Sequence, residues 1–161
     1  MLVKFITYSP VETKQLGGKL SRFCRQGLPS QSRALVVSLE GDLGGGKTTF
    51  LQGFARAFQI RKILSPTFVI YRGYPLTVGP FQKFYHFDFY RLEKASHIQE
   101  LGWGEKLADP RNILAVEWGS KFPSLLPTMK IQVEFVFRQL NERGVFFHFP
   151  PSWSPKWSMS L

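Results

Sequence analysis

Apolar residues along this chain follow two spacings, and together they predict an α/β fold. Short runs rich in β-branched and aromatic residues are typical of strands. Such runs occupy residues 3–8, 34–39, 68–71, 83–90 and 112–118. Helical spacing of apolar residues predicts three helices: one opened by Ser9, Pro10 and Glu12 as a capping box, one beginning near Gly46, and a short one at residues 93–101.

The C-terminal part of the chain has the pattern of a hairpin. Residues 131–137 alternate between apolar and polar side chains, which is the period of a half-buried strand. A turn follows, and residues 145–149 return as the partner strand before Pro150 and Pro151 end the pairing. We therefore expect a single domain over residues 1–150, followed by a disordered tail rich in Ser, Pro and Trp over residues 151–161.

One glycine-rich segment carries the clearest chemical signal. Residues 41–48, Gly-Asp-Leu-Gly-Gly-Gly-Lys-Thr, match the pattern G-x-x-x-x-G-K-[ST] at each fixed position. Its glycines permit positive φ, so that backbone N–H groups can converge on an anion. The strand before it and the helix after it are the context that a phosphate-binding loop requires. Lys47 is expected to reach the β- and γ-phosphates, and the Thr48 hydroxyl to bind Mg²⁺.

These elements predict the fold class. A phosphate-binding loop between a buried strand and a helix indicates a P-loop NTPase, a three-layer α/β fold. We expect a mixed, largely parallel sheet flanked by helices, with the C-terminal antiparallel hairpin added to it.

Composition narrows the setting. The formal net charge of +10 fits a polyanionic partner such as RNA or an acidic protein, or it serves solubility alone; no dense run of Lys and Arg is present. The single cysteine, Cys24, excludes an internal disulfide and is expected to pack on the apolar side of a helix. The three histidines lack a paired spacing, so no protein-bound transition metal is expected. Without a signal-peptide pattern or a membrane-spanning apolar run, the chain is expected in the cytoplasm.

Two acids are candidates to complete the site. Asp88 ends an aromatic strand, and Glu117 follows four apolar residues in the form of a Walker B strand. Ligands gather at the carboxyl ends of strands in α/β sheets, so both acids are expected to face the nucleotide. Our hypothesis is that Asp88 holds Mg²⁺ directly or through water and that Glu117 positions the attacking water, with the reverse assignment open. Arg91 could stabilise phosphate charge or pair with Asp88, and His86 is expected to be a core histidine.

Five stretches of the chain occur in an order that one family shares. They are residues 41–49, Ser65-Pro66-Thr67, residues 86–92 (His-Phe-Asp-Phe-Tyr-Arg-Leu), Glu117-Trp118 and Leu125-Leu126-Pro127. In these stretches the chain resembles the TsaE (formerly YjeE) proteins of bacterial tRNA threonylcarbamoyladenosine synthesis, over roughly residues 1–137.

The resemblance implies a small ATPase that binds ATP and Mg²⁺ and works with the TsaD and TsaB proteins. No association with a membrane is expected. In that family the TsaD–TsaB complex performs the transfer to tRNA, and nucleotide binding and hydrolysis act on the complex, which also provides the contact with tRNA. The implied catalytic residues are Lys47, Asp88 and Glu117, and the implied metal ligands are Thr48, Asp88 and Glu117. The implied nucleotide contacts are Asp42, Leu43, Gly44, Gly45, Gly46, Lys47, Thr48, Thr49, Thr67 and Trp118.

Two other functions remain open on the residues alone. A small-molecule kinase shares the phosphate loop, but the arginines are scattered and form no lid segment. A nucleotide-dependent RNA-binding module would explain the positive charge. A GTPase is disfavoured because the sequence has no N-K-x-D motif and no D-x-x-G switch outside the glycine-rich loop.

Overall fold

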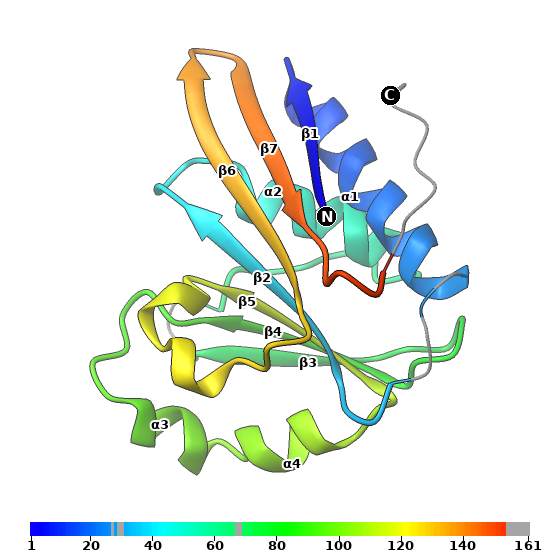
Figure 1. Ribbon diagram of the computed structural model, residues 1–161, viewed down its shortest axis with the longest axis vertical. Coiled ribbons are helices and arrows are strands. Elements are labelled where there is room, and N and C mark those ends of the chain that lie inside the picture. Colours follow the sequence, from blue (N-terminus) through cyan, green and yellow to red (C-terminus); the bar gives the residue numbers. More distant parts are fainter. Residues whose placement is uncertain (27, 29–30, 67–68, 154–161) are drawn as a thin grey trace.

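The computed structural model describes residues 1–26, 28, 31–66 and 69–153 of the chain (Figure 1). Within these residues, seven strands form one sheet in the order β1-β7-β6-β2-β5-β4-β3. The four neighbouring strands β6, β2, β5 and β4 are parallel, whereas β1, β7 and β3 each pair antiparallel with their neighbours. The strands are β1 (Leu2–Thr7), β2 (Leu35–Gly41), β3 (Tyr71–Pro75), β4 (Lys83–Asp88), β5 (Asn112–Glu117), β6 (Ile131–Gln139) and β7 (Glu142–His148). The mixed sheet with its C-terminal β6–β7 hairpin confirms the expected fold class.

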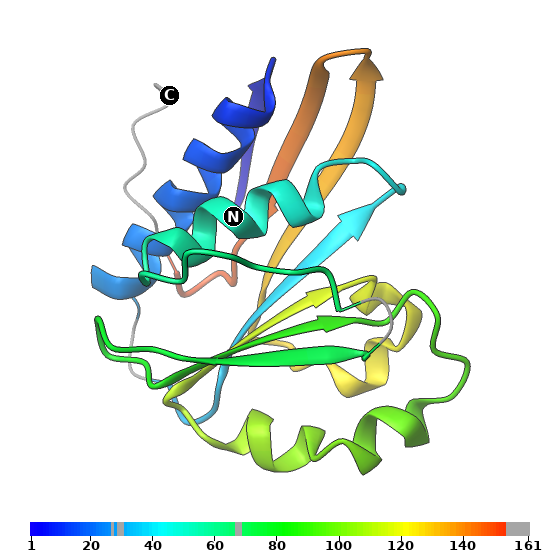
Figure 2. The same ribbon diagram turned by 180° about the vertical axis from the view of Figure 1, so that it is seen from behind.

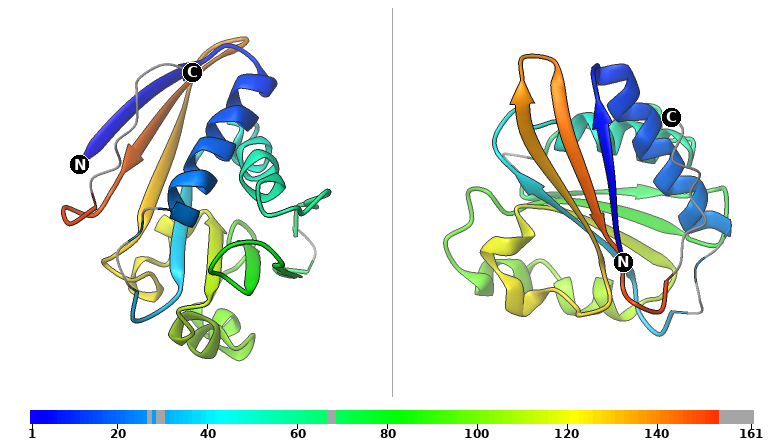
Figure 3. Two further views of the ribbon diagram at one scale, coloured as in Figure 1. Left: turned by 90° about the vertical axis from the view of Figure 1, so that its right-hand side faces the viewer. Right: turned by 45° about the horizontal axis from the view of Figure 1, so that its top comes forward.

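Helices lie on both faces of the sheet and complete three layers (Figures 2 and 3). The long helices α1 and α2 cross on one face, and the shorter helices lie on the other. The helical segments are α1 (Pro10–Gln26), α2 (Lys47–Arg56), α3 (Ala95–Glu100), α4 (Trp103–Ala108), and the 3-10 turns η1 (Gly119–Lys121) and η2 (Pro123–Leu125). In the described part of the chain, every helix is too short or too polar to cross a membrane.

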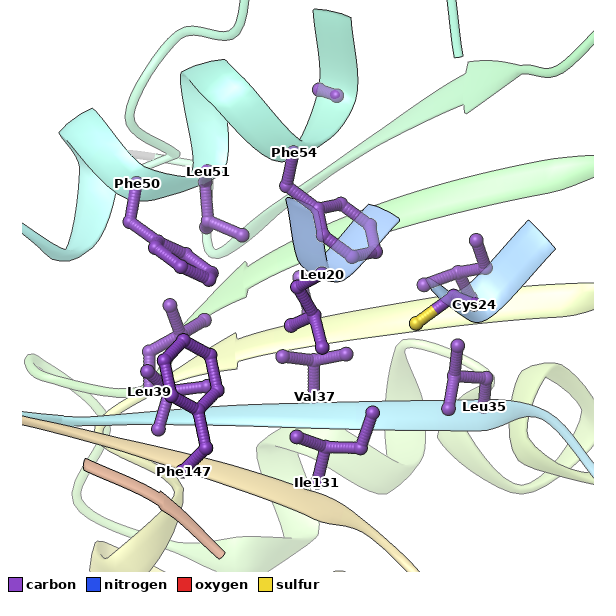
Figure 4. Packing of buried hydrophobic residues seen from close by; sticks show 14 of the residues in the cluster. Leu20, Cys24, Leu35, Val37, Leu39, Phe50, Leu51, Phe54, Ile131 and Phe147 are labelled. Carbon is purple, nitrogen blue, oxygen red and sulfur yellow. The ribbon is translucent and has the colours of Figure 1, made fainter. Parts of the chain in front are cut away.

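The larger core fills the space between the α1–α2 layer and the sheet. Leu20 and Cys24 of α1 and Phe54 of α2 point toward Val37 of β2, and none is more than 2% exposed (Figure 4). Burial raises the pKa of the Cys24 thiol, in keeping with its expected packing role. The two helices can approach closely because Gly53 has no side chain. A Cβ at this position would overlap the backbone carbonyl of Lys14 in α1. This packing fixes α2, and with it the glycine-rich loop at its start.

The first helix begins with the predicted capping box. The Glu12 N–H donates to Ser9 Oγ at 3.2 Å, and the Tyr8 N–H donates to Glu12 Oε2 at 2.8 Å. These bonds satisfy backbone donors that a helix start otherwise leaves without partners. The sequence therefore predicted the beginning of α1 correctly.

The third strand begins later than the sequence predicts. Val69 and Ile70 lie in a turn before β3, in which the Tyr71 N–H donates to the Val69 carbonyl, and residues 67 and 68 lie outside the described residues. The pairing with β4 runs from Tyr71 opposite Phe87 to Pro75 opposite Lys83. The β-branched run suggested the strand, but Ile70 has φ of 65°, outside the extended region, so the strand starts only at Tyr71.

The predicted helix at residues 93–101 is shorter, and a second helix follows it. Helix α3 starts only at Ala95, and Gly102 with φ of 71° ends it, as the sequence indicated. Helix α4 then begins at once and buries Trp103 beneath the sheet. Helix α4 has only six residues, too few to show a periodic pattern of apolar positions, so it was not predicted from the sequence.

The packed domain extends beyond its predicted end. Trp153 was expected in a disordered tail, but it is 1% exposed and belongs to the same core cluster as Phe149. A buried tryptophan removes a large apolar area from water, and this anchors a segment whose Ser and Pro content alone suggests disorder. Residues 154–161, including Trp157, lie outside the described residues.

Candidate functional site

The glycine-rich loop joins β2 to α2 at the carboxyl end of the sheet. Gly41, Gly44 and Gly46 have φ of 124°, 74° and 107°, values that side chains disfavour. Gly45 does not share them, contrary to the expectation that all four glycines would. Its small size matters instead, because a Cβ there would lie 2.9 Å from the Asp42 carbonyl oxygen.

Helix α2 starts at Lys47, close to the expected position, with Gly46 as its N-cap. The Phe50 N–H donates to the Gly46 carbonyl at 2.8 Å, which closes the first turn. The unpaired N–H groups of that turn and the helix dipole both favour an anion at this end. The loop therefore has the backbone form of a phosphate site.

Lys47 is held inside the loop and is only 4% exposed. Its Nζ donates to the carbonyl oxygens of Gly41 at 2.6 Å and Asp42 at 2.8 Å, and lies 4.3 Å from the centre of the Trp118 ring. Burial lowers the pKa of the Lys47 ammonium, and the nearby carboxylates of Glu117 and Asp88 oppose that shift. The ammonium group is thus surrounded by two carbonyl oxygens of the loop and by the ring of Trp118.

The two candidate acids lie side by side. Strands β4 and β5 are parallel, and their register puts Asp88 directly opposite Glu117. The Thr48 hydroxyl donates to Glu117 Oε1 at 3.1 Å, and His86 Nε2 lies 2.8 Å from the same oxygen. Burial raises the pKa of Asp88, and the Glu117 charge acts in the same direction, whereas a hydrogen bond from the Tyr90 N–H opposes both.

This set of donors suits magnesium. Mg²⁺ prefers oxygen ligands and is held in nucleotide sites by one or two carboxylates together with phosphate oxygens and water. Thr48, Asp88 and Glu117 supply a hydroxyl and two carboxylates at the end of the glycine loop. Asp88 and Glu117 are adjacent like charges in partial burial, an arrangement that a divalent cation would relieve.

A hollow of about 520 Å³ gathers most of the predicted site. Its lining residues are Leu43, Gly44, Gly45, Gly46, Lys47, Thr48, Thr49, Ser65, Asp88, Tyr90, Arg91, Glu117 and Trp118. Of the remaining predicted nucleotide contacts, Asp42 is exposed and contributes its carbonyl to Lys47, and Thr67 lies outside the described residues. The hollow is of a size that accepts a small-molecule ligand.

A second, smaller hollow of about 150 Å³ lies on the other side of the loop. Gly44, Gly46 and Thr49 line both hollows, so the loop forms the wall between them. The outer wall comes from the start of α1 and the tip of the β6–β7 hairpin. Its other lining residues are Ser9, Pro10, Thr13, Leu140, Asn141 and Arg143.

His86 has a place in the site that the sequence did not predict. It is fully buried, as expected of a core histidine, but its Nε2 contacts Glu117, and its Nδ1 has no hydrogen-bond partner among the described residues. Side chains two positions apart point to the same face of a strand. The spacing of His86 and Asp88 was therefore a signal that both reach the same site.

A buried carboxylate behind the site was also missed. Glu40 accepts hydrogen bonds from the Ser38 hydroxyl and from both the backbone N–H (3.0 Å) and the hydroxyl (2.7 Å) of Ser120. These bonds fix the position of the turn that follows Trp118. Trp118 itself has φ of 62°, which is uncommon for a bulky residue. No local motif connects residues so distant in sequence.

Comparisons with known proteins point to one family. A family model described as "Threonylcarbamoyl adenosine biosynthesis protein TsaE" matches residues 7–145. The tRNA threonylcarbamoyladenosine biosynthesis protein TsaE of Bacillus subtilis (strain 168) is 36% identical over 146 residues, 90% of this chain and 84% of that protein. The protein of the same name from Rickettsia conorii is 34% identical over 137 residues, 84% of this chain and 71% of its own length. The crystal structure of Bacillus subtilis YdiB matches with a TM-score of 0.70 at 30% identity, covering 91% of this chain and 84% of that one.

Proposed function

The chain belongs to the TsaE family of tRNA threonylcarbamoyladenosine biosynthesis, and from this premise we propose that it binds and hydrolyses ATP with Mg²⁺. The observation that carries the proposal is the meeting of Lys47, Thr48 and Glu117 at the start of α2. A lysine, a hydroxyl and a strand-end acid at a phosphate loop are the groups that ATP hydrolysis requires.

Each group has a separate task in this proposal. The loop N–H groups bind the phosphate oxygens, and Lys47 exchanges its bonds to the Gly41 and Asp42 carbonyls for bonds to the β- and γ-phosphates. Mg²⁺ supplies charge neutralisation on the phosphates when bound. His86 fixes the orientation of Glu117 through its 2.8 Å contact with Oε1.

The contacts favour one assignment of the two acids over the hypothesis from sequence. Glu117, not Asp88, accepts the hydrogen bond of Thr48, the hydroxyl that binds Mg²⁺ in P-loop proteins. We therefore assign Glu117 to the Mg²⁺ side of the site. Asp88 lies beside it with a raised pKa, which suits a group that orients and accepts a proton from the attacking water.

The smaller hollow, at about 150 Å³, is proposed to contact part of the nucleotide beyond the phosphates, since it is too small to enclose the whole base and ribose. It continues from the loop residues that line the phosphate side, and it offers the apolar surfaces of Pro10 and Leu140 with the polar groups of Asn141 and Arg143. An apolar wall with a few polar groups is the common form of a ligand pocket.

The proposed partner is a TsaD–TsaB complex in the cytoplasm, with tRNA reached through that complex. Large apolar side chains are exposed around the site: Leu43 is 66%, Phe137 54% and Leu140 83% exposed. Leu140 and Gly44 line the same hollow, so the hairpin tip and the loop are neighbours. Exposed apolar groups of this kind are typical anchors for a protein partner, which would thereby sense the occupied site.

ATP turnover by the purified protein, alone and with TsaD and TsaB, tests the proposal. We expect slow turnover alone, strong stimulation by the partners, and loss of both in Lys47→Ala. Phe137→Ser, which changes an exposed side chain outside the lining of both hollows, should retain the basal rate and lose stimulation. Arg72→Ser, on the exposed edge strand, is its control.

Two carboxamide variants separate the acids. Glu117→Gln should weaken Mg²⁺-dependent ATP binding, whereas Asp88→Asn should retain binding and lose turnover. Equal effects on binding would contradict the division of tasks, and wild-type behaviour of both variants would refute the site. Phosphate transfer to a small acceptor without partners would favour a kinase instead.

A further inference from the structure

A third hollow lies on the outer side of the helical layer, in the groove between α1 and α2. It has a volume of about 740 Å³. Figure 2 shows the two helices crossing in front of the sheet. The lining residues are Val11, Lys14, Gln15, Gly18, Arg22, Gln52, Gly53, Arg56, Ala57, Arg61, Lys62 and Ile63. Helical spacing along α1 and α2 brings the polar members to one surface.

The groove is strongly basic. Its five charged side chains are Lys14, Arg22, Arg56, Arg61 and Lys62, all exposed. The lining set contains no carboxylate, and none of the four ion pairs among the described residues involves these cations. Five uncompensated cations around one concave surface create a field that concentrates a polyanion.

The cations continue beyond the end of α2. A neighbouring hollow is lined by Arg56, Gln59, Ile60 and Arg61, so two arginines are common to both. An extended row of cations fits a chain of phosphates better than a single phosphate group.

The uncharged lining indicates what kind of polyanion fits. The lining set has no aromatic residue on which an unpaired base could stack, and its amides, Gln15 and Gln52, are exposed hydrogen-bonding groups. Phosphate and 2′-hydroxyl contacts without base stacking are typical of proteins that recognise duplex RNA by shape. A protein partner would need an apolar centre in the interface. Of the large apolar side chains that line the groove, Ile63 is only 5% exposed and Val11 alone is well exposed, so the groove offers no such centre.

The groove is separate from the ATP site. The two hollows share no lining residue. Eight residues of helix α2 separate Thr48 from Arg56, which corresponds to about 12 Å at the α-helical rise. Both ends of α2 could therefore be occupied together.

We propose that the α1–α2 groove binds the phosphate backbone of a folded RNA, a direct contact in addition to any contact made through the TsaD–TsaB complex. The family's role in tRNA modification makes an unmodified tRNA transcript the appropriate probe. The site does not depend on the ATPase proposal, because its residues lie outside the nucleotide pocket.

The test is tRNA binding by fluorescence anisotropy over a range of salt concentrations, for two variants with equal loss of charge. Arg22→Glu/Lys62→Glu reverses two groove cations, and Arg33→Glu/Lys94→Glu reverses two exposed cations elsewhere. We expect the groove variant to bind at least about tenfold more weakly near 100 mM salt, with the slope of log K against log salt reduced by about two. The control should stay within about twofold of wild type, as should the charge-preserving Arg22→Lys/Lys62→Arg.

Two results would overturn the proposal. One is wild-type protein that does not bind tRNA. The other is equal weakening by the groove and control variants, since the attraction would then come from net charge alone. Thermal unfolding and the ATP response of each variant are measured in parallel. A wild-type protein that binds tRNA through the groove but never binds ATP would refute the ATPase proposal and leave the groove proposal standing.

Discussion

The ammonium group of Lys47 lies 4.3 Å from the centre of the Trp118 ring, between the phosphate-binding loop and the end of β5. A cation over an indole face gains roughly 0.5–2 kcal/mol, more where water is excluded. The tryptophan therefore joins the loop to the strand that carries Glu117. It does so from a backbone conformation, φ of 62°, that its side chain disfavours.

That conformation predicts an unusual order of stability at position 118. Trp118→Ala loses the ring and keeps the left-handed strain, whereas Trp118→Gly loses the ring and relieves the strain. We expect the glycine variant to be the more stable of the two by about 1 kcal/mol, measured by urea unfolding. Glycine is normally the more destabilising replacement, so the usual order would show that the positive φ is not a constraint.

Asp88→Asn should stabilise the protein at neutral pH when Mg²⁺ and nucleotide are omitted. Burial raises the pKa of Asp88 in the folded state, so its ionised form opposes folding once the pH exceeds the unfolded pKa. The gain in melting temperature should therefore be present at pH 7 and shrink as the pH falls and wild-type Asp88 becomes protonated. A gain that does not change with pH would mean that the charge of Asp88 is not its cause.

Glu40 is expected to support the site from behind. Glu40→Ala leaves the Ser38 hydroxyl and both Ser120 donors without their acceptor, at a cost of about 2–4 kcal/mol in unfolding free energy. Glu40→Gln keeps one acceptor oxygen and should lose less. Because Ser120 follows Trp118 closely, the alanine variant should also weaken ATP binding. Normal ATP affinity in a destabilised Glu40→Ala would limit Glu40 to a structural role.

Trp153 should determine where the chain can be shortened. Trp153→Ala removes a side chain that is 1% exposed and should cost about 3–5 kcal/mol. A chain that ends after Pro150 should melt at the same temperature as Trp153→Ala, and a chain that ends after Trp153 keeps the buried side chain and should melt at a higher temperature. Equal melting temperatures of the two truncated chains would contradict the anchoring role of Trp153.

The features that were predicted correctly from the sequence are those that depend on local patterns of residues. The capping box of Ser9 and Glu12, the buried strands β2 and β5, and the loop at Gly41–Thr48 each depend on residues close together in the chain. The motif also implied strand-end acids, because the carboxyl ends of parallel strands meet at one edge.

The features that were missed depend on contacts between distant segments. Glu40 and Ser120 are joined only by the fold, and His86 acquires its partner Glu117 through the pairing of β4 and β5. The start of β3 was displaced because Ile70, with φ of 65°, lies in a turn that its β-branched side chain does not suggest. Trp153 was placed in a tail because its composition was considered without the core that receives it.

The pairing of β1 with β7 nearly closes the chain into a ring. The N–H of Phe149 donates to the Met1 carbonyl, and the Met1 amino group donates to the Phe149 carbonyl. Met1 and Phe149 lie at one end of the sheet, beside the starts of the parallel strands. The glycine-rich loop lies at the other end, where these strands finish. A linker that joins Met1 to the chain beyond Trp153, with new termini opened between the exposed residues Gly79 and Pro80, would rearrange the order of the sequence while preserving the sheet and the buried tryptophan. A label attached at Met1 would lie at the end of the sheet opposite the proposed nucleotide site.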